Sequence, residues 1–264
     1  MPSGKRWTRD ELTVALGIYH NLPFGQLDED TPAIIQLAQK LGRSPGSVAM
    51  KLCNLASLDP ALQMRGIRGL PGASNLDREM WAEFHGALEE FVPRSREMLR
   101  EMFKAGPDSE LEVLPKEGIK VRKRPQGDTE VTATVKQRRG QEYFRDAVLN
   151  NFGGACGVSG IAVRQLLVAS HILPWRSHAA ERLNVRNGLC LSRLHDAAFD
   201  IGLISFDDEL RMMLSPALKK HLPQRGIAEN FEAYEGKRLL IPDDAALPEL
   251  AFLATHRDSL FVKK

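Results

Sequence analysis

Cysteine is scarce in this sequence and its count is odd, since Cys53, Cys156 and Cys190 are the only three among 264 residues. Scattered cysteines in this number indicate a reducing compartment and argue against a disulfide framework. The sequence also lacks a run approaching the ~20 apolar residues that a membrane-spanning helix needs. No apolar segment of the kind found in signal peptides follows the charged start from Met1 to Arg9. We therefore expect a cytoplasmic protein without membrane contact.

A strong charge of either sign is missing as well, because 36 Lys and Arg residues face 34 Asp and Glu residues, for a net charge of +2. Such a balance does not by itself indicate a nucleic-acid partner, so any basic surface must come from local clustering. The apolar fraction of 43% and the charged fraction of 27% are typical of a globular protein. The length suits one large or two modest domains.

The first 58 residues predict three short helices. Thr8 with Glu11 three residues later forms a capping-box pattern at the start of the first helix. Pro32 suits the first turn of the second helix, and Ser44 with Pro45 begins the third. Together with the early Trp7, this order resembles the helix-turn-helix of the Myb/SANT type, whose third helix enters the DNA major groove.

On that resemblance, the outward residues of the third helix are expected to contact double-stranded DNA: Arg43, Ser44, Ser47, Lys51 and Asn54. Arg65 and Arg68 lie on a glycine-rich turn that suits a phosphate or a narrow groove. Two alternatives stay open. The alternative for the three helices is a structural or protein-binding module with a solvated face, and the alternative for the turn is a plain surface loop.

Further helices are predicted from Asn75 to about Lys104, and residues 105–139 are predicted to be a linker. Eight basic residues face three acidic residues between Lys116 and Arg139. Such an arm can neutralise phosphates, although a solvated tether explains the composition equally well. We therefore expect a helical DNA-recognition domain at 1–104, a basic linker at 105–139 and a second domain at 140–264.

The second domain contains the motif with the clearest chemistry. A β-prone run, residues 163–169, leads to Ser170 and His171; Asn187-Gly188 follows a loop, and His195 lies on a helix that Ser192 is expected to cap. A predicted helix over 141–150 precedes these residues and a hairpin over 200–215 follows them. The order of His, Asn and His around strand, loop and helix resembles the HNH endonucleases, which carry a ββα-metal nuclease site.

This resemblance implies an α+β protein, with an N-terminal helical domain and a C-terminal ββα-metal (HNH) nuclease domain. Histidine is the side chain best suited to accept a proton near neutral pH, and His171 is predicted to be the general base. By resemblance, Asn187 would keep His171 oriented and His195 would hold a divalent metal ion. The expected ion is Mg²⁺ or Mn²⁺, with Ni²⁺ or Zn²⁺ as alternatives.

The sequence departs from the HNH pattern at the remaining metal ligands. Many of these nucleases have an acidic residue or a histidine directly before the base, where this chain has Ser170, a poor ligand for a hard cation. Asp200 and His178 are candidate helpers. A four-cysteine zinc site is excluded because Cys156 is followed by Ser159 and not by a second cysteine. Cys156 and Cys190 are instead expected to be small buried residues.

Arginine can donate two hydrogen bonds to a phosphate, so some of the arginines near this motif are expected to clamp the DNA backbone. The candidates are Arg176, Arg182, Arg186 and Arg193. By resemblance, the expected function is metal-dependent DNA cleavage in restriction or phage defence, with specificity for modified DNA and a homodimer left open. The alternatives are a non-catalytic DNA-binding protein with a degenerate HNH fold, and an RNase or toxin.

Overall fold

The computed structural model describes residues 5–106, 109–123 and 135–261. These residues form two compact units, Met1–Ala147 (unit 1) and Val148–Lys264 (unit 2). Helices predominate in unit 1, whereas unit 2 combines short helices with two antiparallel strand pairs. The predicted α+β class is confirmed. Among the described residues, no helix is long and apolar enough to cross a membrane.

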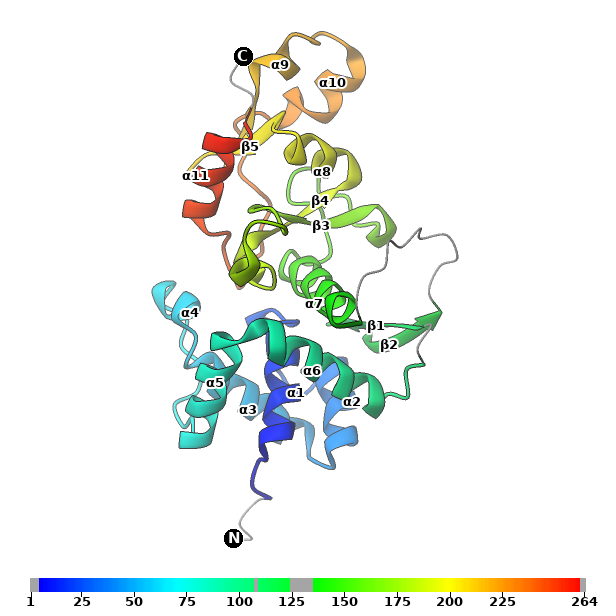
Figure 1. Cartoon of the computed structure of the whole chain (residues 1–264), viewed down its shortest axis with the longest axis vertical. Coiled ribbons are helices and arrows are strands. Elements are labelled where there is room, and N and C mark those ends of the chain that lie inside the picture. Colours follow the sequence, from blue (N-terminus) through cyan, green and yellow to red (C-terminus); the bar gives the residue numbers. More distant parts are fainter. Residues whose placement is uncertain (1–4, 107–108, 124–134, 262–264) are drawn as a thin grey trace. The chain divides into compact units, whose positions relative to one another are not determined.

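Unit 1 is a helical bundle with one β-hairpin. Its elements are α1 (Arg9–Tyr19), α2 (Pro32–Leu41), α3 (Pro45–Ala56), α4 (Pro60–Met64), α5 (Asn75–Gly86), α6 (Leu88–Met102), β1 (Ser109–Leu114), β2 (Gly118–Lys123) and the first part of α7 (Val135–Asn151). Helix α1 packs against α3, α5 and α6 (Figure 1). Its apolar side chains Leu12 and Leu16 are fully buried. The core of unit 1 is therefore built around α1.

The first three helices begin where the sequence predicts. Thr8 and Glu11 form the capping box of α1, in which each side chain accepts a hydrogen bond from the other residue's backbone N–H. Pro32 lies in the first turn of α2, Ser44 caps α3, and Gly42 ends α2 with a φ of 62° that favours glycine. Local sequence signals thus determine these helix boundaries.

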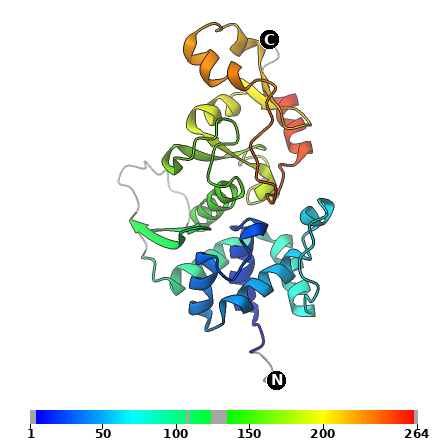
Figure 2. The same cartoon turned by 180° about the vertical axis from the view of Figure 1, so that it is seen from behind.

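Part of the predicted linker is a folded hairpin. Strands β1 and β2 pair from Ser109 opposite Lys123 to Leu114 opposite Gly118, and the hairpin packs beside α2, as the rear view in Figure 2 shows. The side-chain oxygen of Gln36 in α2 accepts a hydrogen bond from the backbone N–H of Ile119 (2.6 Å). The predicted linker over 105–139 is therefore wrong for residues 109–123. The strand that 130–135 could add lies largely outside the described residues.

Buried charges hold the hairpin and α7 to the bundle. Arg96 in α6 is 3% exposed and donates to the Asp146 carboxylate and to the Leu111 carbonyl (2.9 Å). The same carboxylate accepts the backbone N–H of Val113 (3.1 Å). The buried charges are tolerated because Arg96 and Asp146 neutralise each other and the backbone groups of Leu111 and Val113 complete their hydrogen bonds. Arg139, expected in the linker, is also buried and pairs with Glu97 and Glu142.

Unit 2 contains the remaining elements. These are the end of α7, β3 (Leu167–His171), β4 (Gly188–Ser192), α8 (Arg193–Asp200), β5 (Ile204–Phe206), β6 (Met212–Leu214), α9 (Pro216–Lys219), α10 (Arg225–Asn230) and α11 (Leu250–Ser259), with 3₁₀ turns at Arg164–Leu166, Ala179–Glu181, Val185–Asn187 and Glu232–Tyr234. Strands β3 and β4 pair antiparallel, from Leu167 opposite Ser192 to His171 opposite Gly188. Helix α8 packs on both strands (Figure 1). This is the expected ββα arrangement.

Candidate active site

His171 lies at the end of β3, half-buried, with a fixed ring orientation. Its Nε2 is 3.0 Å from the carbonyl oxygen of Arg182. Since a carbonyl can only accept, Nε2 carries the proton and Nδ1 is the nitrogen with the lone pair. The Trp175 ring meets the imidazole edge-on, with 5.3 Å between ring centroids. Burial lowers the pKa of His171, and the Arg182 carbonyl opposes this shift. A neutral imidazole with an accepting Nδ1 suits a general base.

Asn187 is fully buried and holds the loop between the two strands. Its Oδ1 accepts the backbone N–H of Leu173 (2.8 Å), and its Nδ2 donates to the carbonyls of Leu173 (3.3 Å) and Glu181 (3.1 Å). Glu181 directly precedes Arg182, whose carbonyl orients His171. In this geometry Asn187 acts on His171 through the loop backbone. Its orienting role stays a prediction that the geometry supports.

The described contacts of His195 are all to protein groups, so its role as a metal ligand stays a prediction. It is 2% exposed, and its Nε2 donates to the carbonyl of Asn230 (2.8 Å). Its Nδ1 lies 2.9 Å from Ser192 Oγ and 3.6 Å from Cys156 Sγ. Both ring nitrogens are therefore used inside unit 2. In this setting His195 links structural elements, and both ring nitrogens are engaged by protein groups.

Cys156 and His195 form a buried, charge-assisted pair. The Cys156 thiol is fully buried; burial alone would raise its pKa, but hydrogen bonds from His195 and from Ser159 lower the pKa to about 6. Burial likewise opposes the charged form of His195, yet the Cys156 sulfur and the Asn230 carbonyl raise its pKa. The sulfur also accepts the backbone N–H of Ser192 (3.2 Å). The prediction that Cys156 and Cys190 are buried is confirmed.

The carboxylates best placed for a cation are Asp196 and Asp200. They lie four residues apart on α8, hence on one face of the helix. Burial raises the pKa of both, and the charge of Asp196 adds to the rise at Asp200. Arg193 and the Ser170 hydroxyl act against the rise at Asp196. Asp196 was not predicted from the sequence, although the spacing of the two acids on the helix is a signal for it.

The Ser170 hydroxyl lies beside Asp196, where its hydrogen bonding lowers the pKa of that carboxyl. The residue is 2% exposed, and its Oγ makes no hydrogen bond of full geometry among the described residues. A buried hydroxyl that makes no full hydrogen bond and lies beside a carboxylate fits an oxygen-liganded cation. The described residues nevertheless contain no group of three or more His, Cys, Asp or Glu side chains that could hold a metal. The candidate ligands of a cation are therefore the carboxylates of Asp196 and Asp200 and the Ser170 hydroxyl.

His178, the other predicted metal helper, and the nearby arginines differ in whether they bond to the protein or are exposed to solvent. His178 bonds its neighbour Ser177 (2.9 Å). Arg186 is used internally, since it pairs with Glu249 (2.8 Å) and donates to the Leu247 carbonyl (3.1 Å). Arg176 and Arg193 are exposed to solvent. Exposure favours the latter two for a phosphate contact and makes Arg186 a poor candidate.

In unit 1, two predicted DNA contacts are buried. The Arg43 side chain is 4% exposed, pairs with Glu11 (2.8 Å) and stacks over the Trp7 ring at 4.1 Å. Lys51 is also buried, and its Nζ donates to both carboxylate oxygens of Asp77 (2.9 and 2.8 Å). The prediction that Arg43 and Lys51 point outward is wrong. They pack inside the bundle around Trp7, and we do not assign them to a DNA interface.

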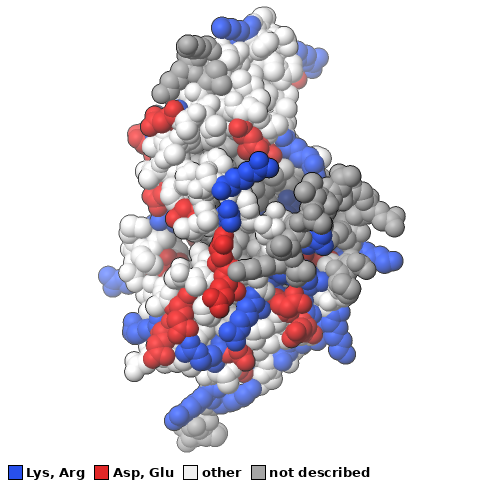
Figure 3. All heavy atoms as spheres, in the orientation of Figure 1, with Lys and Arg blue, Asp and Glu red and all other residues white. Residues whose placement is uncertain are grey.

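The rest of the predicted interface is only partly accessible. The loop after α4 lies against the end of α3, where the Leu70 N–H donates to the Cys53 carbonyl (3.0 Å). Ser47, Asn54 and Arg65 are half-buried, whereas Ser44 and Arg68 are exposed. On the face of unit 1 seen in Figure 3, Lys and Arg side chains are interspersed with Asp and Glu. That face offers no continuous basic surface.

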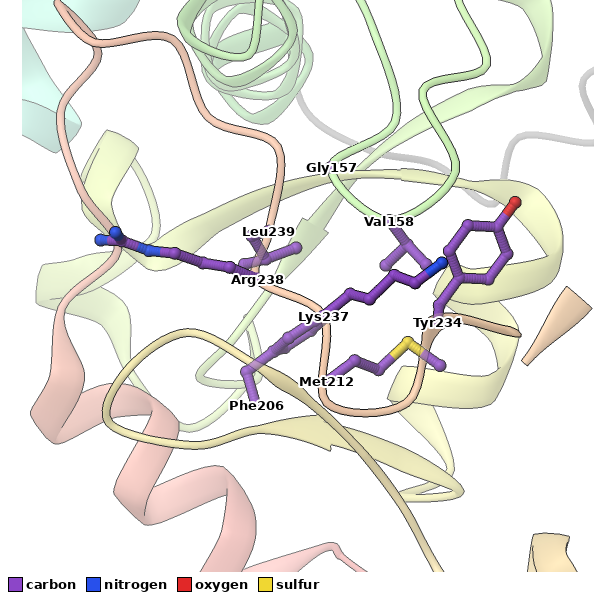
Figure 4. Close-up of a pocket in the computed structure, with 8 residues that line it drawn as sticks. All are labelled: Gly157, Val158, Phe206, Met212, Tyr234, Lys237, Arg238 and Leu239. Carbon is purple, nitrogen blue, oxygen red and sulfur yellow. The ribbon is translucent and has the colours of Figure 1, made fainter. Parts of the chain in front are cut away.

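A small pocket lies beside the turn over residues 156–160. Its lining is formed by Gly157, Val158, Phe206, Met212, Tyr234, Lys237, Arg238 and Leu239. Figure 4 shows the Lys237 side chain extending past Val158 towards Tyr234, and its Nζ lies 5.6 Å from the centroid of that ring. The lining contains neither a histidine nor a carboxylate. We therefore do not place the chemistry there.

Comparison with known proteins supports the interpretation of unit 2. Residues 156–207 match the family described as HNH endonuclease. The match begins at Cys156, spans β3, β4 and α8, and ends just after β5. An HNH endonuclease domain is therefore present, and it implies nuclease chemistry. No curated protein matches the chain. The match does not include unit 1, so the helix-turn-helix resemblance stays a prediction.

Proposed function

We propose that this chain is a metal-dependent DNA endonuclease of the HNH type, with His171 as its general base. The observation that carries the proposal is the fixed ring of His171. Its Nε2–H is bonded to the Arg182 carbonyl at 3.0 Å, which leaves Nδ1 as the proton acceptor. This histidine lies within the residues that match the HNH endonuclease family.

In the proposed reaction, His171 Nδ1 accepts a proton from a water molecule as the water oxygen forms a bond to phosphorus. The bond between phosphorus and the leaving oxygen breaks, and that oxygen takes a proton from solvent. Asn187 keeps the loop backbone, and with it the Arg182 carbonyl, in place. Arg176 and Arg193 are the exposed arginines that would contact the phosphate backbone.

Asp196 and Asp200 would hold a divalent cation, with the Ser170 hydroxyl as a further oxygen. When bound, the cation stabilises charge on the phosphate and on the leaving oxygen. All these candidate ligands are oxygens, which favours Mg²⁺ or Mn²⁺ over Ni²⁺ or Zn²⁺. The raised pKa of Asp200, caused by burial and by Asp196, is a sign of like charges that a cation would relieve.

The test is cleavage of supercoiled plasmid and of phage DNA with Mg²⁺ or Mn²⁺, by the wild type and by His171→Ala. We expect metal-dependent cutting by the wild type and a rate at least ~10²-fold lower for the variant, the range typical of a lost general base. Equal rates for the two proteins would contradict the assignment of His171. Parallel digestion of unmodified DNA, modified phage DNA and RNA tests the proposed restriction role against an RNase or toxin.

A second candidate function is a DNA-binding protein that no longer cuts. It is favoured by Ser170 in place of an acidic ligand and by the lack of a three-residue metal cluster among the described residues. Under this alternative, the purified protein shifts DNA in gels but never cuts it with Mg²⁺, Mn²⁺ or Ni²⁺. Metal-dependent cutting that His171→Ala abolishes would exclude it.

A further inference from the structure

Three residues of unit 2, namely the proposed base His171 with Trp175 and Arg182, form a closed ring of contacts. The His171 Nε2–H donates to the backbone carbonyl of Arg182, and the Trp175 ring meets the imidazole edge-on. The Arg182 Nε–H donates to the backbone carbonyl of Trp175 (2.6 Å), and its guanidinium lies over the Trp175 ring at 5.3 Å from the centroid. Each member of the ring thus contacts both others.

The ring of contacts determines which nitrogen of His171 faces the reaction. A half-turn of the imidazole about its Cβ–Cγ bond would put Cε1 in the place of Nε2 and Cδ2 in the place of Nδ1, and it would break the bond to the Arg182 carbonyl. The Trp175 edge at 81° to the imidazole plane restricts that rotation further. A base must point its lone pair at the attacking water, so this restriction favours the reactive orientation.

Arg182 differs from its neighbour Arg176 in how its charge is used. Arg182 is half-buried, and its guanidinium bonds and stacks on Trp175, whereas Arg176 is exposed in the same loop. A planar guanidinium can donate a hydrogen bond and stack on an aromatic face at once, which a lysine ammonium cannot do. The sequence suggested both arginines as phosphate contacts, and the geometry separates them.

We propose that Trp175 and Arg182 are positioning residues that hold His171 in its Nε2–H tautomer and reactive orientation. This inference rests on the proposed function, because it assigns His171 as the base. Arg182 then contributes to the rate of the chemical step and not to the electrostatic attraction of DNA. Trp175 contacts both the Arg182 guanidinium and the His171 imidazole, so the position of the guanidinium restricts the orientation of the imidazole.

The first test compares Arg182→Lys and Arg182→Gln with Arg176→Gln. Single-turnover cleavage at saturating DNA should be at least ~10-fold slower for both Arg182 variants, since small misplacements of catalytic groups have large effects. Their DNA affinity should stay within about twofold of the wild type, with an unchanged salt slope. Arg176→Gln should instead weaken binding and lower the slope of log affinity against log salt by about 1. The same reduced slope for Arg182→Gln would overturn the proposal, because it would make Arg182 a phosphate contact.

The second test does not depend on activity. Long-range ¹H–¹⁵N NMR correlations at an alkaline pH, where the ring is neutral, report the tautomer of His171. The wild type and Arg176→Gln should show a single Nε2–H form, and Trp175→Ala and Arg182→Gln a mixture of both tautomers. Trp175→Phe, which keeps an aromatic ring, should restore most of the wild-type signal. An unchanged single tautomer in folded Trp175→Ala and Arg182→Gln would refute the inference. A wild type that never cuts DNA would refute the proposed function instead.

Discussion

Replacing Cys156 with alanine tests the buried pair that links the start of the HNH-matched region to α8. The variant removes a fully buried sulfur and its contact with His195 Nδ1 at 3.6 Å, and it leaves the backbone N–H of Ser192 without its acceptor. Cys190→Ala is the matched control, because Cys190 is equally buried on β4.

The expected loss can be built from three contributions. A thiol with a folded pKa of about 6 stabilises the fold by ~1.4 kcal/mol at pH 7, since each pKa unit is worth ~1.36 kcal/mol. Removing a buried group of this size costs ~1 kcal/mol. An orphaned buried N–H at Ser192 adds ~1–3 kcal/mol. Cys156→Ala should therefore lower the free energy of unfolding by about 3–5 kcal/mol, against about 1 kcal/mol for Cys190→Ala.

The difference should depend on pH, because the pair needs both charges. The pKa of Cys156 is lowered on folding, so its contribution is lost as pH falls through about 6. The pKa of His195 is raised on folding, so its contribution is lost as pH rises through the folded value. Urea unfolding followed by circular dichroism at pH 5, 7 and 8 measures this. A loss for Cys156→Ala no larger than that for Cys190→Ala at every pH would refute the reasoning.

Two further predictions follow from the corrected sites. Asp196→Asn should raise the Mg²⁺ concentration needed for half-maximal cleavage about tenfold or more. His195→Gln should lower the stability of the fold and leave that Mg²⁺ concentration unchanged. A metal titration that shifts only for His195→Gln would instead identify the histidine as the ligand. Lys51→Met removes the cation paired with the buried Asp77 carboxylate, so it should lower the free energy of unfolding in urea by ~3–5 kcal/mol without changing DNA affinity. Arg68→Ala should lower DNA affinity but not stability. Weaker DNA binding by folded Lys51→Met would contradict this assignment.

The sequence predicts the helix boundaries of unit 1 because they depend on neighbouring residues. The Thr8 capping box and the glycine at position 42 act within one turn of the chain. The hairpin of β1 and β2 was not predicted, although Leu111 and Val113 alternate with glutamates in the way of a half-buried strand. Its basic residues resembled a linker, and its support from Gln36 comes from a distant helix.

The same distinction explains the errors at the proposed DNA interface. Helical periodicity shows which side chains share a face of α3, but it does not show which other element covers that face. Lys51 is covered because Asp77 of α5 meets it, and Arg43 is covered because Glu11 and Trp7 do. These partners are separated from α3 along the chain, so only the folded bundle reveals them.

The predicted metal ligand His195 and the proposed ligand Asp196 are neighbours in the sequence. Adjacent residues on a helix point ~100° apart, so His195 and Asp196 meet different neighbours. The Ser192 cap fixes the start of α8, which turns His195 towards Cys156 and Asp196 towards Ser170. The family resemblance indicates which helix and strand flank His171, whereas the side-chain contacts of α8 depend on how the helix is rotated.

This rotation also changes the meaning of Ser170. Two carboxylates, Asp196 and Asp200, already balance the charge of a divalent cation. A third acid at position 170 would leave the site with a net negative charge and repel the anionic phosphate. A neutral hydroxyl would contribute an oxygen without that charge, and the Ser170 Oγ makes no hydrogen bond of full geometry among the described residues. The serine is therefore compatible with catalysis, and its presence is a weaker argument for a decayed site than the sequence alone suggests.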